Sequence, residues 1–378
     1  MQKKILLLSG YDAKSHKLWR ERLVSLLPEY EWTQLILPPR NFNWRIRSNS
    51  LQWASTHRET LCRNYDLLLT TSMVDLSSLR GFVPELSRLP TAVYFHENQF
   101  AYPLNKQAEK NIEPILVPIY TALCADKLIF NSNYNRYTFL KGVKNLFEKL
   151  PDKLPKEILK KLENNRIIPV PAENPGKAKP IKLINQLDVV WNHRWEYDKG
   201  PERLLRLIEE VDARSLPIRF HIVGEQFRGT PKVFADIQLR SSLHAKRLGM
   251  EPGAFGYISN RLEYYTLLQK SDVVLSTALH DFQGLAVQEA CLAGCSPLTP
   301  HALAYPEYIP TNCMYKNIDN EKMRTRELIE MLNKLLKLKK ENYSLPQVAL
   351  EHYTGKFLKN KYNELVKELL DFKQTHKK

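Results

Sequence analysis

The chain has 378 residues, of which 43% are hydrophobic, and this length is more typical of two domains than of one. The mean hydropathy is −0.41, and no apolar run approaches the roughly 20 residues that a membrane-spanning helix needs. The 56 Lys and Arg against 41 Asp and Glu give a net charge of +15, which favours a polyanionic partner, either nucleic acid or an anionic membrane face. A basic cytosolic enzyme without such a partner is the alternative interpretation.

The five cysteines are scattered, odd in number and form no CxxC pair. The sequence therefore predicts neither a disulfide framework nor a zinc site. The first apolar run lacks a small-residue cleavage site, so we interpret it as a strand rather than as a signal peptide. We expect the protein to reside in the reducing cytoplasm.

The first half of the chain alternates short apolar runs with segments of helical periodicity. The opening run, 3–10, ends in a glycine, and an amphipathic helix is expected over 13–27. Further apolar runs lie at 33–38, 66–72, 91–98 and 127–132. This alternation is typical of a parallel β-sheet with helices on both faces.

The composition changes in the middle of the chain. Residues 140–166 form a basic stretch with helical character, and 167–182, rich in Pro, Gly and Lys, are predicted to be a linker. After it the alternation restarts, with strands expected within 186–194, 218–224 and 271–278, and helices over 200–211 and 355–378.

These patterns predict an α/β protein with two Rossmann-like domains, 1–175 and 182–355, followed by a C-terminal helix, 356–378. In open α/β sheets, ligands bind outside the carboxyl ends of the strands. The sequence contains neither the P-loop G-x-x-x-x-G-K-[ST] nor the dinucleotide-binding G-x-G-x-x-G, so a bound nucleotide would need other anchors.

Two segments of the second domain place charged side chains at the ends of predicted strands. In the first, WNHRWEYDKGP at 191–201, Arg194 and Lys199 are close enough in sequence to converge on one anion. The helix that begins near Pro201 would add its N-terminal dipole. A solvated loop is the alternative interpretation of the two cations.

The second segment places Asp281 and Glu289 eight residues apart, with Gly284 between them. Glycine lets a backbone approach a ligand closely, and the amides that follow can donate to a phosphate or sugar oxygen. Glu289 lies in an otherwise apolar helix, where a carboxylate without a partner is costly. Either the ribose hydroxyls of a ligand or an internal salt bridge would satisfy it.

The order Asp-Phe-Gln-Gly-x-x-x-x-Glu resembles the donor-site motif E-x-F-G-x-x-x-x-E of the retaining GT-B glycosyltransferases of family 4, with Asp281 in place of the first Glu. Further motifs are similar to one branch of that family, the tRNA-queuosine mannosyltransferases. They run in order along nearly the whole chain: SHKLW, LPPRNFNWRIRSNSL, YFHENQFAYP, FNSNYN, LPDKLPK, WNHRWEYDKGP, and GCSPL with YPEYIP.

The resemblance implies a GT-B fold, in which two Rossmann-like domains face a cleft and the C-terminal helix returns to the first domain. It implies GDP-mannose as the donor and transfer of mannose, with retained configuration, to the cyclopentene-diol of queuosine in a tRNA anticodon, with tRNA-Asp expected. It also implies that no metal cofactor is needed, because basic side chains and helix dipoles take that place.

Roles for single residues follow from the same resemblance. Arg194 and Lys199 would neutralise the donor diphosphate and the leaving GDP. Asp281 would orient the sugar together with the amides near Gly284 and Leu285. The rest of the expected donor site comprises Gly10, which closes over the phosphates, Gly224, and Glu289, which holds the ribose.

His96, in the FHENQ motif, would face the donor and either bond a sugar hydroxyl or steady the oxocarbenium-like transition state. A core histidine satisfied by the backbone is the alternative. Further expected acceptor contacts are Ser15, His16, Glu97 and Asn98.

For RNA, the best local feature is PPRNFNWRIR, residues 38–47. Its arginines suit phosphates and its aromatic rings can stack on splayed bases. The residues expected to contact tRNA here are Arg40, Trp44, Arg45 and Arg47. An exposed basic turn with Trp44 in the core is the alternative, and the lysines of 141–161 are a second candidate surface unless they form a solvated helix face.

Two other functions stay open at this point. One is a family-4 transferase that acts on a lipid-linked or surface glycan at an anionic membrane, with the same donor site and an amphipathic basic helix. The other is a GT-B protein that binds tRNA and has lost transfer, a hypothesis suggested by Asp281 in place of Glu.

Overall fold

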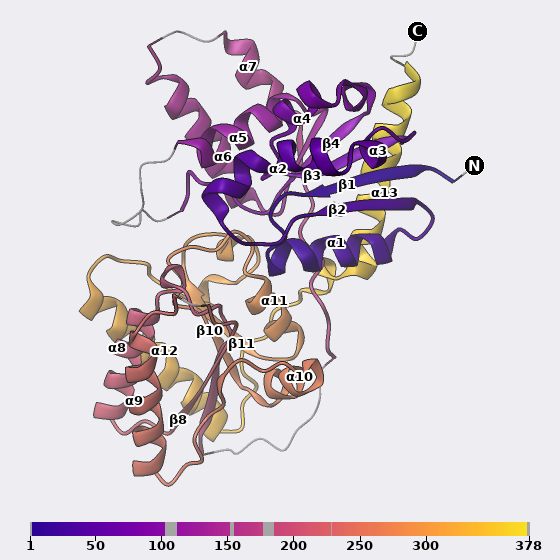
Figure 1. Ribbon diagram of the computed structural model, residues 1–378. Coiled ribbons are helices and arrows are strands. Elements are labelled where there is room, and N and C mark those ends of the chain that lie inside the picture. The colour runs from indigo at the N-terminus through magenta and orange to yellow at the C-terminus, as the bar shows by residue number, and fades with distance from the viewer. Residues whose placement is uncertain (1, 103–111, 152–154, 177–184, 228, 376–378) are drawn as a thin grey trace. The chain divides into compact units, whose positions relative to one another are not determined.

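The computed structural model describes residues 2–102, 112–151, 155–176, 185–227 and 229–375. The chain divides into two compact units (Figure 1). Unit 1 comprises 1–171 and 355–378, and unit 2 comprises 172–354. Each unit contains one six-stranded sheet whose paired strands are all parallel, as the alternating pattern predicts.

The sheet of unit 1 has the strand order β2-β1-β3-β4-β5-β6. Its strands are β1 (Lys4–Ser9), β2 (Glu31–Ile36), β3 (Leu67–Thr71), β4 (Thr91–Phe95), β5 (Lys127–Phe130) and β6 (Asn165–Ile167). Its helices are α1 (Lys14–Leu26), α2 (Phe42–Thr56), α3 (Arg58–Leu61), α4 (Leu76–Phe82), α5 (Glu113–Leu123), α6 (Asn133–Phe147), α7 (Lys156–Lys161) and α13 (Gly355–Thr375).

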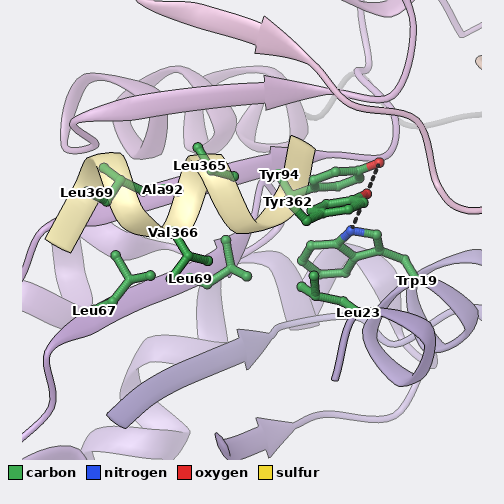
Figure 2. A pocket seen from close by; sticks show the side chains of 10 residues that line it. All are labelled: Trp19, Leu23, Leu67, Leu69, Ala92, Tyr94, Tyr362, Leu365, Val366 and Leu369. Atoms are coloured by element: carbon green, nitrogen blue, oxygen red, sulfur yellow. Dashed lines mark hydrogen bonds between the residues drawn. The ribbon is translucent and has the colours of Figure 1, made fainter. Parts of the chain in front are cut away.

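Successive residues of the central strands of unit 1 point to opposite faces of the sheet. Leu68 and Val93 pack into the core formed with α2, α4, α5 and α6. Leu69 and Tyr94, one position along each strand, face α1 and α13 instead, where Leu23 and Leu365 meet them (Figure 2). This two-sided burial explains why the strands are apolar throughout.

The C-terminal helix α13 therefore belongs to unit 1, as the GT-B resemblance implies. A chain of hydrogen bonds attaches it (Figure 2). Trp19 Nε1 donates to Tyr362 Oη over 3.1 Å, and Tyr362 Oη donates to the Pro169 carbonyl over 2.9 Å and lies 3.4 Å from Tyr94 Oη. All three rings are fully buried, so each polar atom needs the partner that it has.

The sheet of unit 2 has the order β12-β11-β10-β7-β8-β9. Its strands are β7 (Leu187–Trp191), β8 (Ile218–Val223), β9 (Phe255–Gly256), β10 (Val273–Leu275), β11 (Ser296–Pro300) and β12 (Met314–Tyr315). One core lies against α8 (Pro201–Ala213), α9 (Val233–Arg247) and α12 (Glu321–Lys340), and the other against α10 (Arg261–Lys270) and α11 (Leu285–Leu292).

The structure changes two expectations about the middle of the chain. The basic stretch 140–166 is not one helix but the end of α6, α7 and β6. The boundary between the two units, at 171/172, falls inside the predicted linker 167–182, and the first part of that linker is packed, with Ile168, Val170 and Ala172 buried. Residues 177–184 of that segment lie outside the described residues.

No helix in the described part of the chain has the length and apolarity that crossing a bilayer requires.

Tyr362→Phe should destabilise unit 1, because the Trp19 indole would lose its acceptor inside the core. We expect the free energy of unfolding in urea to fall by about 1–3 kcal/mol. Tyr343→Phe, at an exposed position of unit 2, is the matched control and should change it by less than about 0.5 kcal/mol. Equal stability of both variants would contradict this account of how α13 is held.

Candidate functional site

The two charged segments of unit 2 meet at one point of its sheet. Strand β7 lies between β8 and β10, so the strand order reverses between β7 and β10. Asn192 to Lys199 follow β7, and Ser276 to Gly284 follow β10. Ligands of open α/β sheets bind at such a reversal, outside the carboxyl ends of the strands.

Gly200 joins the two segments. It has a φ of +66°, and a Cβ at this position would lie 2.2 Å from the Thr277 carbonyl oxygen, so only glycine fits. Thr277 Oγ1 donates to the Lys199 carbonyl over 2.9 Å. The start of α8 is therefore fixed against the loop that follows β10.

Lys199 is the central cation of the site. Its buried ammonium donates to the His280 carbonyl over 2.7 Å and pairs with Asp198 at 3.1 Å. The Asp281 carboxylate is 3.7 Å away, beyond ordinary hydrogen-bond length. The bond to His280 engages one ammonium donor, while Asp198 and Asp281 are ion-pair partners, so a donor stays available to a ligand oxygen.

Arg194 lies at the rim of this arrangement. Its guanidinium pairs with Glu196 at 2.8 Å and approaches Asp198 at 3.7 Å, and 37% of its side chain is exposed. Arg194 and Lys199 thus share one carboxylate, Asp198, and their convergence on a ligand anion stays a prediction.

Asp281 is held from several sides. The Gly284 amide donates to its Oδ1 over 2.9 Å, and Tyr305 Oη donates to its Oδ2 over 3.3 Å. Burial alone would raise the pKa of Asp281. The nearby Lys199 ammonium, the His193 imidazole and the hydrogen bond from the Gly284 amide lower this pKa to about 2. The residue is therefore a fixed anion that orders the loop before α11.

Helix α11 begins at a second left-handed glycine, Gly284, with a φ of +75°. The first bond within the helix runs from the Gln288 amide to the Gly284 carbonyl. The amides of Leu285 and Ala286 consequently have no acceptor within the helix and carry its positive dipole end. The residues Leu285 and Ala286 are themselves partly exposed.

These amides matter because the side chains alone would not attract an anion. The two cations, Arg194 and Lys199, are paired with three carboxylates, those of Glu196, Asp198 and Asp281. The side chains of the cluster therefore carry a net charge of −1. An arriving phosphate would depend on the N-terminal end of α11 and on the free donor of Lys199.

Glu289 is buried on α11, close enough to Tyr264 for its charge to act on the tyrosine hydroxyl. Burial, and next the Glu289 charge, raise the pKa of the Tyr264 hydroxyl. Asn192 donates through Nδ2 to Tyr264 Oη and to the Ala286 carbonyl, both over 2.9 Å. Glu289, Tyr264 and Asn192 thus place hydroxyl-binding groups next to the start of α11.

Two histidines that sequence reasoning missed also lie here. His193 and His280 are buried, and burial lowers their pKa to about 4 and about 3. Both are neutral at physiological pH and can donate or accept a hydrogen bond. His193 lies at the end of the predicted strand 186–194 and His280 two residues after the predicted strand 271–278, and this position at the carboxyl ends of strands is the signal that the sequence offers for them.

Gly224, which is expected in the donor site, packs closely against the backbone that follows β7. A Cβ here would lie 1.7 Å from the His193 carbonyl oxygen. The glycine lets the loops after β7 and β8 touch, so it shapes the site from behind.

In unit 1, His96 ends β4 at the carboxyl edge of the sheet. It is buried and stacks on His16, with ring centroids 4.0 Å apart. Burial, and next His16, hold the pKa of His96 well below its usual value. Neither ring nitrogen of His96 has a hydrogen-bond partner among the described residues, so the core-histidine alternative leaves two polar atoms unexplained.

The other residues expected to contact the acceptor differ in burial and in hydrogen bonding. Ser15 is exposed, and Glu97 accepts a hydrogen bond from Tyr102 Oη over 3.1 Å. Asn98 is buried, with its amide nitrogen donating to Asn135 and its oxygen accepting from the Phe100 amide. Asn98 therefore stabilises its loop and does not face an acceptor, which corrects the prediction for it.

Gly10 follows β1, next to the end of β3. A Cβ there would lie 3.0 Å from the Met73 carbonyl oxygen, so the close approach is to the protein's own backbone.

The expected row of tRNA-binding arginines is wrong in part. Residues 42–47 are not a loop but the start of α2, so the side chains point to different sides. Arg45 is buried and donates to Gln52, and Arg47 pairs with the buried Asp75 at 2.7 Å. Arg40 is exposed, and Trp44 is 68% exposed, so Trp44 is not a core residue.

In the described parts of the chain, no group of three or more His, Cys, Asp or Glu side chains is arranged to hold a metal ion.

Acidification should destabilise unit 2 through its buried histidines. The pKa of His193 is about 4, against 6.5 for a free histidine, so below pH 6.5 the unfolded state takes up the proton first. Between pH 7 and pH 5 the free energy of unfolding should fall by about 2 kcal/mol through this group.

His193→Gln should therefore lose less stability than the natural chain over the same pH range in urea unfolding. His301→Gln, at an exposed position of the same unit, is the control and should keep the full pH dependence. A His193→Gln profile parallel to that of the natural chain would contradict the neutral, buried state of His193.

Comparison with known proteins agrees with this architecture. Residues 4–172 match the family model for the N-terminal part of tRNA-queuosine alpha-mannosyltransferase. A tRNA-queuosine alpha-mannosyltransferase from Drosophila melanogaster is 31% identical over 324 residues, covering 82% of this chain and 83% of the relative.

Solved structures share the fold at low identity. Sucrose-phosphate synthase from Thermosynechococcus elongatus superposes with a TM-score of 0.68 at 13% identity, over 98% of this chain and all of the other. TarM gives a TM-score of 0.55 at 16% identity over 85% of this chain, which spans only 58% of TarM. The fold is GT-B, and the chain belongs to the tRNA-queuosine alpha-mannosyltransferase family of glycosyltransferases.

Proposed function

We propose that the chain transfers mannose from GDP-mannose to the cyclopentene-diol of queuosine in a tRNA anticodon, with retention of configuration. The observation that carries the donor half is the cluster of Lys199, Asp281 and the start of α11 at the strand-order reversal of unit 2. The acceptor half rests on family membership and on the name of the Drosophila melanogaster relative. We further propose tRNA-Asp as the substrate and the cytoplasm as the compartment of the reaction, as the resemblance implies.

In the proposed donor site, the diphosphate accepts from the free donor of Lys199 and from the amides of Leu285 and Ala286. Arg194 exchanges part of its pairing with Glu196 for a phosphate oxygen. Glu289 accepts hydrogen bonds from the ribose hydroxyls. These groups stabilise the charge that develops on the leaving diphosphate, which is usually the largest contribution in such sites.

The transfer itself needs one bond made and one broken. The queuosine hydroxyl oxygen bonds to C1 of mannose while the bond from C1 to the phosphate oxygen breaks. The leaving phosphate takes the hydroxyl proton. The hydroxyl therefore attacks C1 on the same face of the sugar that the phosphate leaves, which retains the configuration at C1. His96 of unit 1 is neutral, and neither of its ring nitrogens has a hydrogen-bond partner among the described residues, so it is available to hydrogen-bond a hydroxyl of a bound substrate.

No metal cofactor is part of this proposal, because the helix end and the two cations supply the positive charge. Saturating EDTA should leave the transfer rate within about twofold of the untreated enzyme, measured as mannosylated nucleoside formed per minute. A loss of activity that Mg²⁺ or Mn²⁺ restores would contradict the metal-free donor site.

The direct test incubates the protein with GDP-mannose and queuosine-containing tRNA, digests the RNA and weighs the nucleosides by mass spectrometry. A hexose added to queuosine is the expected result. GDP-mannose binding without that product would indicate another acceptor, such as a membrane glycan. Binding of tRNA without any donor binding would indicate a protein that has lost transfer.

Glu289→Gln should weaken GDP-mannose binding by about 10- to 100-fold, because a carboxylate hydrogen bond to the ribose is worth about 1.5–3 kcal/mol. Its affinity for tRNA should stay unchanged. Calorimetry with the nucleotide sugar measures the first and fluorescence anisotropy with tRNA the second. Glu330→Gln, exposed on α12, is the control, and equal losses for both ligands would assign Glu289 to the structure instead.

A further inference from the structure

Positive charge is concentrated in one stretch of unit 1. Residues 133–166 contain nine Lys and Arg against four Asp and Glu, so 34 residues carry +5 of the net +15. Both arginines of α2 that are expected to contact RNA have partners within the protein instead. Arg45 is buried and donates to Gln52, and Arg47 is ion-paired with Asp75. The charge available to a polyanion in this unit is therefore greater on α6 than on α2.

Helix α6 separates its apolar and basic residues by face. Phe139 and Val143 are fully buried in the core of unit 1. Tyr137, Lys141 and Lys144, spaced four and three residues apart, are exposed on the opposite side. Together with Arg136 they line a shallow groove of about 520 Å³ along the helix.

Tyr137 gives this basic face an aromatic platform. Its side chain is 58% exposed, and Lys141 Nζ lies 5.5 Å from the ring centroid. A flat aromatic ring flanked by cations is what single-stranded nucleic acid binding uses, since bases stack on the ring and phosphates pair with the cations.

The start of α6 is fixed next to the loop that carries His96. Ser132 caps the helix, and Asn135 in its first turn donates to the Phe95 carbonyl over 3.0 Å. Asn131, just before the helix, donates to the His96 carbonyl over 2.9 Å. The exposed basic residues of α6 therefore begin close to the carboxyl edge of the unit 1 sheet. This is the edge that carries His96 and at which we expect the acceptor base.

We propose that this face of α6 is a tRNA-binding surface: Arg136, Lys141 and Lys144 pair with phosphates beside the anticodon, and Tyr137 stacks on an unpaired base. The inference rests on the proposed function for the identity of the polyanion. An anionic membrane fits less well, because a membrane-binding helix turns its apolar face outward, whereas that of α6 is buried in the core.

The test compares two double variants of the full chain with the same charge change and the same spacing. Lys141→Ala plus Lys144→Ala alters the α6 face, and Lys334→Ala plus Lys337→Ala alters exposed lysines of α12 in unit 2. Binding of fluorescein-labelled tRNA is measured by anisotropy from about 50 to about 200 mM KCl. Product formation from GDP-mannose is measured in parallel.

The α6 variant should bind tRNA about tenfold more weakly at the lowest salt, and the slope of log Kd against log salt should fall by about 2. The α12 variant should match the natural chain. Tyr137→Ala should weaken binding at all salt concentrations, whereas Tyr137→Phe, which keeps the ring, should not.

Equal tRNA affinity and salt slope for the two double variants would overturn the assignment of α6, whether or not the protein forms product. Sedimentation with phosphatidylserine vesicles is measured for the same proteins. If the α6 double variant sediments less than the natural chain while its tRNA binding is unchanged, the assignment is overturned in favour of a membrane surface. If the natural chain forms no mannosylated nucleoside, the proposed function fails, and the anisotropy measurements still decide whether α6 binds RNA.

Discussion

The site in unit 2 depends on one buried cation. Removing the Lys199 ammonium from water is costly, and two contacts offset that cost: a carbonyl of the loop after β10, and the carboxylate of Asp198 in the turn Tyr197–Lys199 at 3.1 Å. That requirement fixes the loop on which Asp281 lies, and Asp281 in turn caps the turn into α11. The helix end, the cation and the carboxylate are therefore in place before a ligand arrives, which is the preorganisation that charge stabilisation requires.

A comparable constraint orders the first unit. Tyr362 of the C-terminal helix accepts from Trp19, and Trp19 and Tyr94 pack around the ring of His96. The last helix of the chain thus supports the histidine at the sheet edge through two aromatic side chains. The packing of the C-terminal helix against unit 1 is therefore needed to hold His96 in place, in addition to being a feature of the GT-B topology.

The sequence predicted the layered α/β fold well, because apolar runs and amphipathic helices report burial directly. It also predicted that Arg194, Lys199 and Asp281 would gather, since the carboxyl ends of parallel strands share one edge. It did not predict which side chains point into the core. Arg45 is buried, Trp44 is exposed, and Asn98 is buried and hydrogen-bonded to Asn135 of α6. Such outcomes depend on the rotation of each helix and loop against the sheet, which a local pattern does not contain.

The measurement that tests the central claim most directly is a crystal structure of the protein with GDP. The account predicts diphosphate oxygens within hydrogen-bond distance of Lys199 Nζ and of the amides that begin α11, with the ribose hydroxyls on Glu289. A nucleotide bound elsewhere, or bound here with its ribose turned away from Glu289, would contradict it.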